Sequence, residues 1–257
     1  MSAPTPTTPS VDLNADLGEG VGDDATMVSL VSSANVACGF HAGTPLLLKQ
    51  TCAAAVAAGV QIGAQVSYPD PSGFGRRFMD VAADELIADV TYQIGALTAI
   101  AASVGGAVEY VKPHGALYNT IVHHERQAQA VVTAVAAAGL PLMCLPGSVA
   151  LELATAQGVA AVTEAFADRG YTSAGTLVPR TEPGALLTDS TVIAQRVVEL
   201  VRTGELVSIE GERISVHADS ICLHGDTPGA VEHARHVAAA LTEAGYAVRP
   251  FAADARA

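Results

Sequence analysis

Four polar motifs contain the residues whose types could support acid–base chemistry. In the first, VDLNADLGEG, residues Asp12, Asn14 and Asp16 alternate with apolar residues, and Glu19 follows. A period of two is typical of a β-strand, whose successive side chains point to opposite faces. Asp and Asn are depleted from ordinary strands, so three on one face predict a strand that borders an enclosed site. They could act as a general base, orienting acceptors or metal ligands; the alternative is a strand-end turn in which they cap backbone amides.

Three further motifs place histidines and a lysine near the ends of predicted strands. ACGFHAGTP contains His41, KPHGALYN contains Lys112 and His114, and CLHGD contains His224 and Asp226. A lysine that points inward from a strand is costly unless it is paired, so we expect an acidic partner for Lys112 from the first strand. A structural hydrogen-bonding role is the alternative for a histidine, and it stays open here.

Two loops could supply cations for an anionic ligand. SYPDPSGFGRR contains Arg76 and Arg77, and LVPR contains Arg180. Arginine suits bidentate contacts with carboxylate or phosphate, although we expect at least one of Arg76 and Arg77 to be a solvated surface residue. The formal net charge is −13, so an anionic substrate would be repelled by the whole molecule and would need such local cations.

Composition and missing motifs exclude several function classes. The net negative charge argues against a nucleic-acid surface. No apolar run reaches the length of a membrane span, and the N-terminus lacks the basic and apolar segments of a secretory signal. We therefore predict a cytoplasmic protein whose four scattered cysteines are reduced. Walker-type phosphate loops, G-x-G-x-x-G fingerprints and G-x-S-x-G elbows are absent from the sequence.

Ala-rich helical segments that end at glycine alternate with short β-rich runs, for example around Gly59 and Gly139. This alternation predicts a parallel sheet covered by helices. The seven predicted strands are residues 11–16, 35–39, 60–65, 108–112, 140–145, 161–166 and 220–224. Because polar residues share one parity and gather at strand C-terminal ends, a closed TIM-like α/β barrel is favoured over an open sheet.

The predicted domain organisation is simple. Residues 1–10, rich in Pro and Thr, are expected to be a disordered lead-in, and residues 11–257 are expected to form one barrel domain. Residues 171–219 interrupt the rhythm with a Pro/Gly-rich loop, a helix at about 189–202, and a hairpin that turns at Glu210-Gly211. We interpret this segment as an insertion within the last βα unit.

These motifs, together with YQIGAL and FADRGY, occur in an order that resembles the LamB/YcsF family over residues 11–251. The resemblance implies an irregular seven-stranded (β/α) barrel related to the glycoside hydrolase/deacetylase superfamily. It also implies the 5-oxoprolinase reaction, in which 5-oxoproline (pyroglutamate) is opened to L-glutamate with ATP hydrolysis. Two partner subunits, B and C, would take part, and ATP would be a co-substrate together with Mg²⁺.

The resemblance also bears on a metal site. Related deacetylase barrels hold a metal with one Asp and two His, and many LamB/YcsF members have His-Pro where this chain has Gln65-Val66. An amide is a weaker ligand than imidazole for a transition metal. A site built from Asp16, His41 and position 65 is therefore disfavoured, and the metal content stays open.

Within the implied reaction, ATP would phosphorylate the lactam oxygen and so create an intermediate that water can attack. Asp16, helped by Asp12, would be the base, one of the histidines would move protons, and Lys112 and Arg180 would neutralise negative charge. The residues expected to be catalytic are Asp12, Asp16, His41, Lys112 and His114. Those expected to bind substrate are Asn14, Glu19, Gln65, Arg180, His224 and Asp226. A stand-alone metal-dependent deacetylase or hydrolase of a carbohydrate or amide, and a non-catalytic substrate-binding subunit, remain as alternatives.

Overall fold

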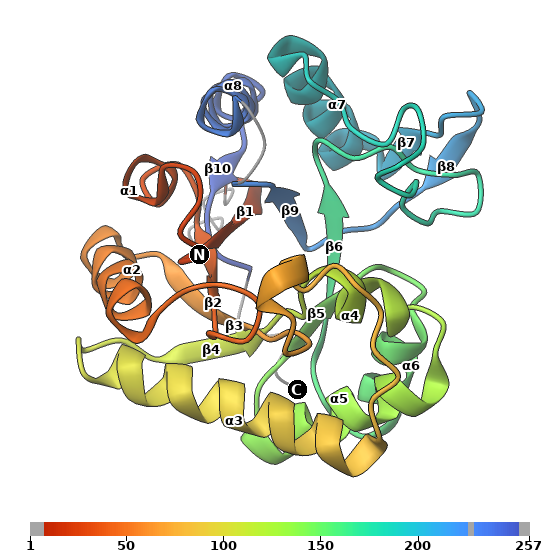
Figure 1. The fold of residues 1–257 in the computed structure, drawn as a ribbon. Helices are drawn as coiled ribbons and strands as arrows, with labels where there is room; N and C mark the ends of the chain where they lie inside the picture. Colours follow the sequence, from red (N-terminus) through yellow and green to blue (C-terminus); the bar gives the residue numbers. More distant parts are fainter. Residues whose placement is uncertain (1–7, 226–228, 252–257) are drawn as a thin grey trace, which may run out of the picture.

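A closed barrel of seven parallel strands forms the centre of the computed structural model, which describes residues 8–225 and 229–251. The order around the barrel is β1-β2-β3-β4-β5-β6-β9, and β9 pairs back with β1 (Figure 1). The strands are β1 (Ser10–Leu17), β2 (Ser33–Ala37), β3 (Gln61–Gln65), β4 (Val108–Val111), β5 (Leu142–Cys144), β6 (Ala161–Phe166) and β9 (Ser220–Leu223). The predicted barrel is confirmed. β2 begins two residues earlier than expected, and Ser10 belongs to β1 instead of the predicted lead-in.

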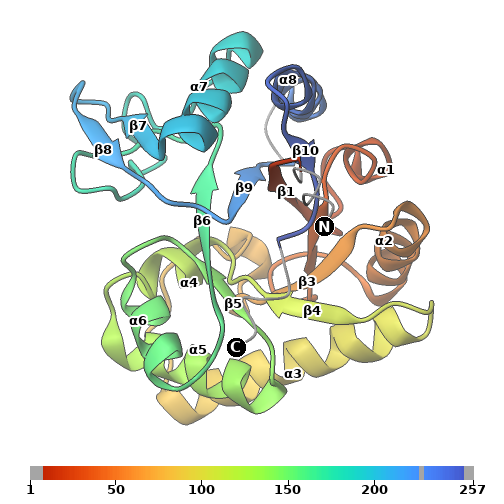
Figure 2. The ribbon, with the colours of Figure 1, turned by 180° about the vertical axis from the view of Figure 1, so that it is seen from behind.

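Helices surround the barrel, as Figures 1 and 2 show from opposite sides. They are α1 (Asp24–Met27), α2 (Pro45–Ala58), α3 (Ala83–Ala102), α4 (Gly115–Thr120), α5 (Glu125–Ala138), α6 (Val149–Ala156), α7 (Ser190–Thr203) and α8 (Ala230–Glu243). The Thr44 side chain caps α2 by accepting from the Leu47 amide at 3.3 Å, and Gly59 ends that helix with φ +69°. Across the described ranges, no helix has the length and apolar character needed to cross a membrane.

The segment between β6 and β9 contains the predicted helix α7 and the predicted hairpin, β7 (Glu205–Val207) paired with β8 (Arg213–Ser215). Helix α7 packs against α8. The Pro/Gly-rich loop before α7 does not simply lie on the outer surface, because its residues 176–180 reach the barrel mouth. Strand β10 (Ala247–Val248), which pairs with the start of β1, was not predicted.

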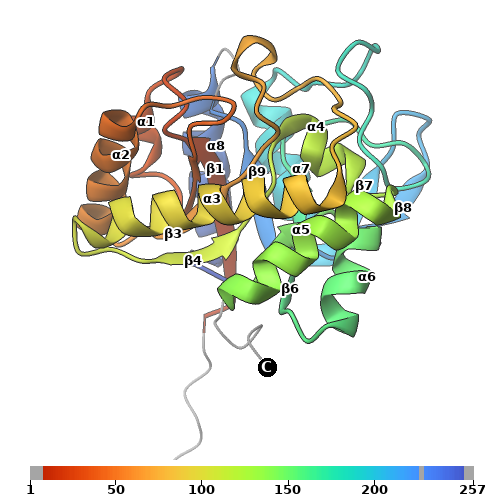
Figure 3. The same ribbon diagram turned by 60° about the horizontal axis from the view of Figure 1, so that its bottom comes forward.

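The barrel interior is layered by the parity of β1. Leu13 and Ala15 point outward and join the core beneath the helices. Asp12, Asn14 and Asp16 point inward, where they contact residues from other strands of the barrel. The connections that follow the strands, including the loop between β3 and α3, gather at one end (Figure 3). This end is therefore the mouth, and only the last residue of the inward set, Asp16, lies there. All four cysteines fall within the described residues and are buried and unpaired, as predicted.

Candidate active site

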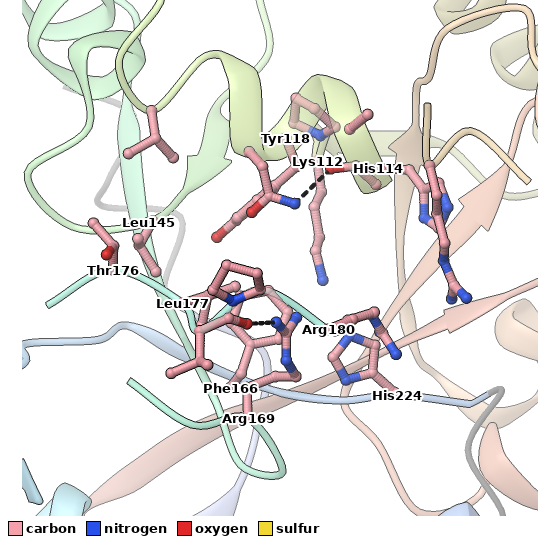
Figure 4. A pocket seen from close by; sticks show the side chains of 18 of the residues that line it. Lys112, His114, Tyr118, Leu145, Phe166, Arg169, Thr176, Leu177, Arg180 and His224 are labelled. Atoms are coloured by element: carbon pink, nitrogen blue, oxygen red, sulfur yellow. Dashed lines mark hydrogen bonds between the residues drawn. The ribbon is translucent and has the colours of Figure 1, made fainter. Parts of the chain in front are cut away.

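A cavity of about 570 Å³ opens at the C-terminal ends of the strands, where α/β barrels place their active sites. Figure 4 shows Lys112 extending toward the middle of the ring of labelled side chains, with Arg180 and His224 on the other side. Asp16 and His114 also line this cavity. Five of the predicted site residues, taken from β1, the ends of β4 and β9, and the insertion, thus meet in one pocket.

Lys112 is buried and surrounded by acidic groups. Its Nζ lies 3.3 Å from Asp16 Oδ1, which confirms the expected partner on the first strand, and 2.7 Å from Glu164 Oε1 on β6. Burial alone lowers the pKa of Lys112, but Asp16, Cys222 and Glu164 outweigh this effect and raise the pKa well above its usual value. Lys112 is therefore a fixed positive charge at the floor of the pocket.

Asp16 is the carboxylate that faces the pocket. Its Oδ1 accepts a hydrogen bond from Asn35 Nδ2 at 2.9 Å, and its Oδ2 lies 3.7 Å from His114 Nδ1. Burial raises the pKa of Asp16, yet Lys112 and His114 overcome that effect and hold the pKa well below its usual value. Asp16 is therefore ionised at neutral pH, as a group that accepts a proton from water must be.

Asn14 and Asp12 lie below the pocket. Asn14 Oδ1 accepts from Lys112 Nζ at 3.1 Å and from Asn35 Nδ2 at 2.7 Å, so it supports the floor without lining the cavity. Asp12 accepts from Ser32, Ser33 and Ser220. Four strand residues separate Asp12 from Asp16, or about 13 Å along β1. The structure therefore does not bring Asp12 to the site where it was expected to help Asp16.

Behind the pocket wall, Glu19, His41, Gln65 and His114 form a buried cluster. Glu19 Oε1 lies 2.9 Å from Gln65 Nε2 and 3.2 Å from His41 Nε2. The rings of His41 and His114 stack with their centroids 4.0 Å apart. Burial is the main reason that the pKa of His41 is lowered. Of these four residues, only His114 reaches the pocket, so Glu19, His41 and Gln65 are not placed to touch a ligand there.

The loop between β3 and α3 covers this cluster. Phe74 packs edge-on against His41 and His114, and its carbonyl accepts from His114 Nε2 at 3.0 Å. Phe74 has φ +54°, a strained conformation for a bulky residue. Arg76, two residues further on, lines the pocket, whereas Arg77 pairs with Asp70 and its side chain is 65% exposed. The loop therefore contributes one of its two arginines to the site.

A carboxylate–imidazole pair that we did not predict lies across the pocket from Asp16. His224 Nδ1 is 2.8 Å from Asp168 Oδ1, and the His224 ring stacks on Phe166. Burial raises the pKa of Asp168, but His224 outweighs this effect and the pKa is lowered. The available signal was FADRGY, in which Asp168 follows shortly after a strand that ends at the mouth. Asp168 therefore fixes the orientation of a potential proton donor.

Arg169, also in FADRGY, was missed as well. It lines the pocket and donates to Val178 O at 2.6 Å and to Ala185 O at 3.1 Å, which ties the insertion loop to the barrel. Burial, followed by the nearby charge of Arg180, lowers the pKa of Arg169 to about 10. At neutral pH the pocket thus has two guanidinium groups on this side. The remaining predicted residue, Asp226, lies outside the described residues.

Comparisons with known proteins agree with this architecture. The sequence profile of the LamB/YcsF family matches residues 11–256. A protein of Kocuria rhizophila that is named as the first subunit of 5-oxoprolinase is 58% identical over 249 residues, which cover 94% of this chain and 99% of that protein. The crystal structure of a lactam utilization protein from Thermus thermophilus superposes with a TM-score of 0.90 at 44% identity, covering 94% of this chain and all of the other.

More distant similarity concerns the fold alone. A family 4 carbohydrate esterase from Streptomyces lividans is 14% identical with a TM-score of 0.51, covering 93% of this chain and 91% of the other. At this identity the likeness supports the predicted relationship of the barrel to deacetylase folds and carries no residue roles. The profile match and the identity over nearly the whole length are specific, and this chain therefore belongs to the LamB/YcsF family.

Proposed function

We propose that this protein is a subunit of an ATP-dependent 5-oxoprolinase, located in the cytoplasm, and that its barrel mouth is where the lactam ring is opened. The observation that carries the proposal is the pocket, in which one ionised carboxylate faces a lysine and two arginines. A small anionic substrate requires local cations in a molecule of net charge −13. The name of the Kocuria rhizophila relative and the lactam utilization title of the Thermus protein support the same substrate class.

In the proposed reaction, the lactam oxygen attacks the γ-phosphorus of ATP, the bond to ADP breaks, and the ring nitrogen loses its proton. Water then adds to the phosphorylated carbon and gives a proton to Asp16. As the carbon–nitrogen bond breaks, the nitrogen regains its proton and takes a second one from His224. Another water releases phosphate and leaves L-glutamate. The protein mainly supplies positioning and charge neutralisation, as phosphoryl transfer requires.

Lys112 links these steps. While it contacts Asp16, it keeps the carboxylate ionised but weakly basic. When Lys112 shifts toward a phosphoryl group, Asp16 loses part of this stabilisation and becomes a stronger base at the moment when water must be activated. Arg169 and Arg180 are suited to the substrate carboxylate or to phosphate oxygens, which guanidinium groups bind in a bidentate manner.

ATP, with Mg²⁺ held by its phosphates, and two partner subunits, B and C, complete the proposal. The word subunit in the relative's name supports an assembly. Because the sequence has no Walker-type loop, the nucleotide would be held by strand-end loops of this chain or by a partner.

The test uses the reconstituted complex with both partners and measures 5-oxoproline-dependent formation of ADP and glutamate. We expect Asp16→Asn and Lys112→Ala to reduce kcat by roughly 10²-fold or more, as loss of an acid–base or charge-stabilising group does. Glu182→Gln, which changes an exposed residue of the insertion, is the control. Full turnover by folded Asp16→Asn and Lys112→Ala complexes would show that the barrel mouth is not the reaction site.

A further inference from the structure

The buried cluster behind the pocket has the composition and spacing of a metal site. One ligand atom from each of Glu19, His41 and His114 lies within 4.8 Å of the others. Glu19 Oε1 is 3.2 Å from His41 Nε2 and 3.5 Å from His114 Nδ1. Ligand atoms bound to a tetrahedral zinc ion at its usual bond lengths are about 3.3 Å apart. We propose that Glu19, His41 and His114 bind a divalent transition metal of the Zn²⁺ class.

The hydrogen bonds of His114 fit this role. Its Nε2 lies 3.0 Å from the carbonyl oxygen of Phe74, so Nε2 carries the proton and the lone pair of Nδ1 faces the cluster. A backbone carbonyl bound to the remote ring nitrogen is the usual arrangement for a histidine that ligates a metal. The strained residue Phe74 thus holds His114 in the tautomer that ligation requires.

Gln65 supplies a fourth group. Its Nε2 lies 2.9 Å from Glu19 Oε1 and 3.0 Å from His114 Nδ1, so a donor now lies between two acceptors that would otherwise converge on a cation. Its Oε1 is buried and has no hydrogen-bond partner among the described residues, and the same holds for His41 Nδ1. A half-turn of the amide exchanges nitrogen and oxygen with almost no change of shape, and it presents Oε1 as a ligand.

This arrangement differs from the Asp16, His41 and position 65 set considered from the sequence. The acidic ligand is Glu19 and the second imidazole is His114, while Asp16 stays with Lys112. A metal bound there would provide a Lewis acid beside the pocket wall. The binding site is defined by this chain alone and is independent of the proposed 5-oxoprolinase reaction, so a failure of either leaves the other standing.

The test measures metal binding directly on the full chain. Protein stripped with a chelator is titrated with Zn²⁺ and with Co²⁺, and bound metal is quantified by elemental analysis after gel filtration. We expect one ion per chain, with the intense visible absorption of four-coordinate Co²⁺. His41→Ala and Glu19→Gln should lose that ion, whereas His236→Ala, which removes an exposed histidine of α8, should keep it.

Gln65→His gives an independent readout, because imidazole is the better ligand for these metals. We expect it to bind Zn²⁺ at least about tenfold more tightly than the unmodified chain, a factor within the range seen for ligand-shell changes. The proposal is overturned if the unmodified chain retains no metal, or if His41→Ala and Glu19→Gln retain as much as His236→Ala. It is also overturned if Gln65→His leaves the affinity unchanged.

Discussion

Asp168 controls the chemistry of its neighbour through a single contact. Its carboxylate lies 2.8 Å from His224 Nδ1 and stabilises the protonated ring. Asp168→Asn keeps the shape but removes the charge. We expect kcat/KM of the reconstituted complex to fall roughly 10²-fold, and the alkaline limb of its pH profile to move to lower pH, because His224 then holds its proton less tightly.

A purely structural role for Asp168 predicts a different result. Activity would then fall in proportion to the loss of folded protein, and the position of the alkaline limb would stay unchanged. The pH dependence of kcat/KM, measured beside the melting temperature of the same variant, separates these outcomes. Glu182→Gln, an exposed change in the adjacent insertion, should alter neither quantity.

The loop between β3 and α3 acts as a cover whose fit depends on Gly75. Gly75 has φ +66°, and an added Cβ would lie 2.8 Å from His41 Cβ and 3.0 Å from His114 Cδ2. Gly75→Ala therefore displaces the loop or the stacked histidines. We expect a loss of activity of at least about tenfold, since small displacements of a site are costly for catalysis.

Gly59→Ala is a matched control, because Gly59 has φ +69° and its added Cβ would meet no atom within 4 Å. Both variants carry the strain of a left-handed alanine, which is about 1–2 kcal/mol in the free energy of unfolding. Only Gly75→Ala adds the contact with the histidines. Equal activity of the two variants in the reconstituted assay would rule out a positioning role for this loop.

The contrast between strands and loops explains what the sequence could predict. Alternation on β1 and glycines after helices identified the barrel, because those signals depend on local periodicity and backbone conformation. Glu19 follows Gly18, whose φ is +74°, and its partners His41 and His114 come from distant loops. No periodicity relates such residues, so their cluster could be found only in three dimensions.

At the scale of the whole molecule, the barrel separates two buried acidic sites by their position along β1. Asp16 at the mouth pairs with a lysine, and its pKa is lowered. Asp12, near the opposite end, meets only neutral hydroxyl groups in its hydrogen bonds, from Ser32, Ser33 and Ser220. Burial raises the pKa of Asp12 to about 6, and the serine hydroxyls offset only part of the effect. The sequence showed the shared face of these residues but not the depth at which each one lies.

This separation predicts a change in stability without a loss of chemistry. Between about pH 4 and pH 6 the folded protein holds a proton on Asp12 that the unfolded chain releases, so the contribution of Asp12 to stability falls as pH rises. A shift from 3.8 to about 6 corresponds to about 3 kcal/mol above pH 6. Asp12→Asn mimics the protonated acid. Relative to the unmodified chain, it should therefore gain about this much unfolding free energy between pH 4.5 and pH 7.5, measured by urea denaturation.

The difference between the two proteins at each pH isolates Asp12 from other titrating groups, including Asp16 and Asp168, whose lowered pKa values act in the opposite direction. Asp84→Asn, which changes an exposed carboxylate at the start of α3, should show no such pH-dependent difference. In the reconstituted assay, Asp12→Asn should keep its turnover, because Asp12 lies about 13 Å below the group that faces the pocket. A large loss of kcat in a folded Asp12→Asn complex would instead return Asp12 to the catalytic role first expected from its place beside Asp16 in the sequence.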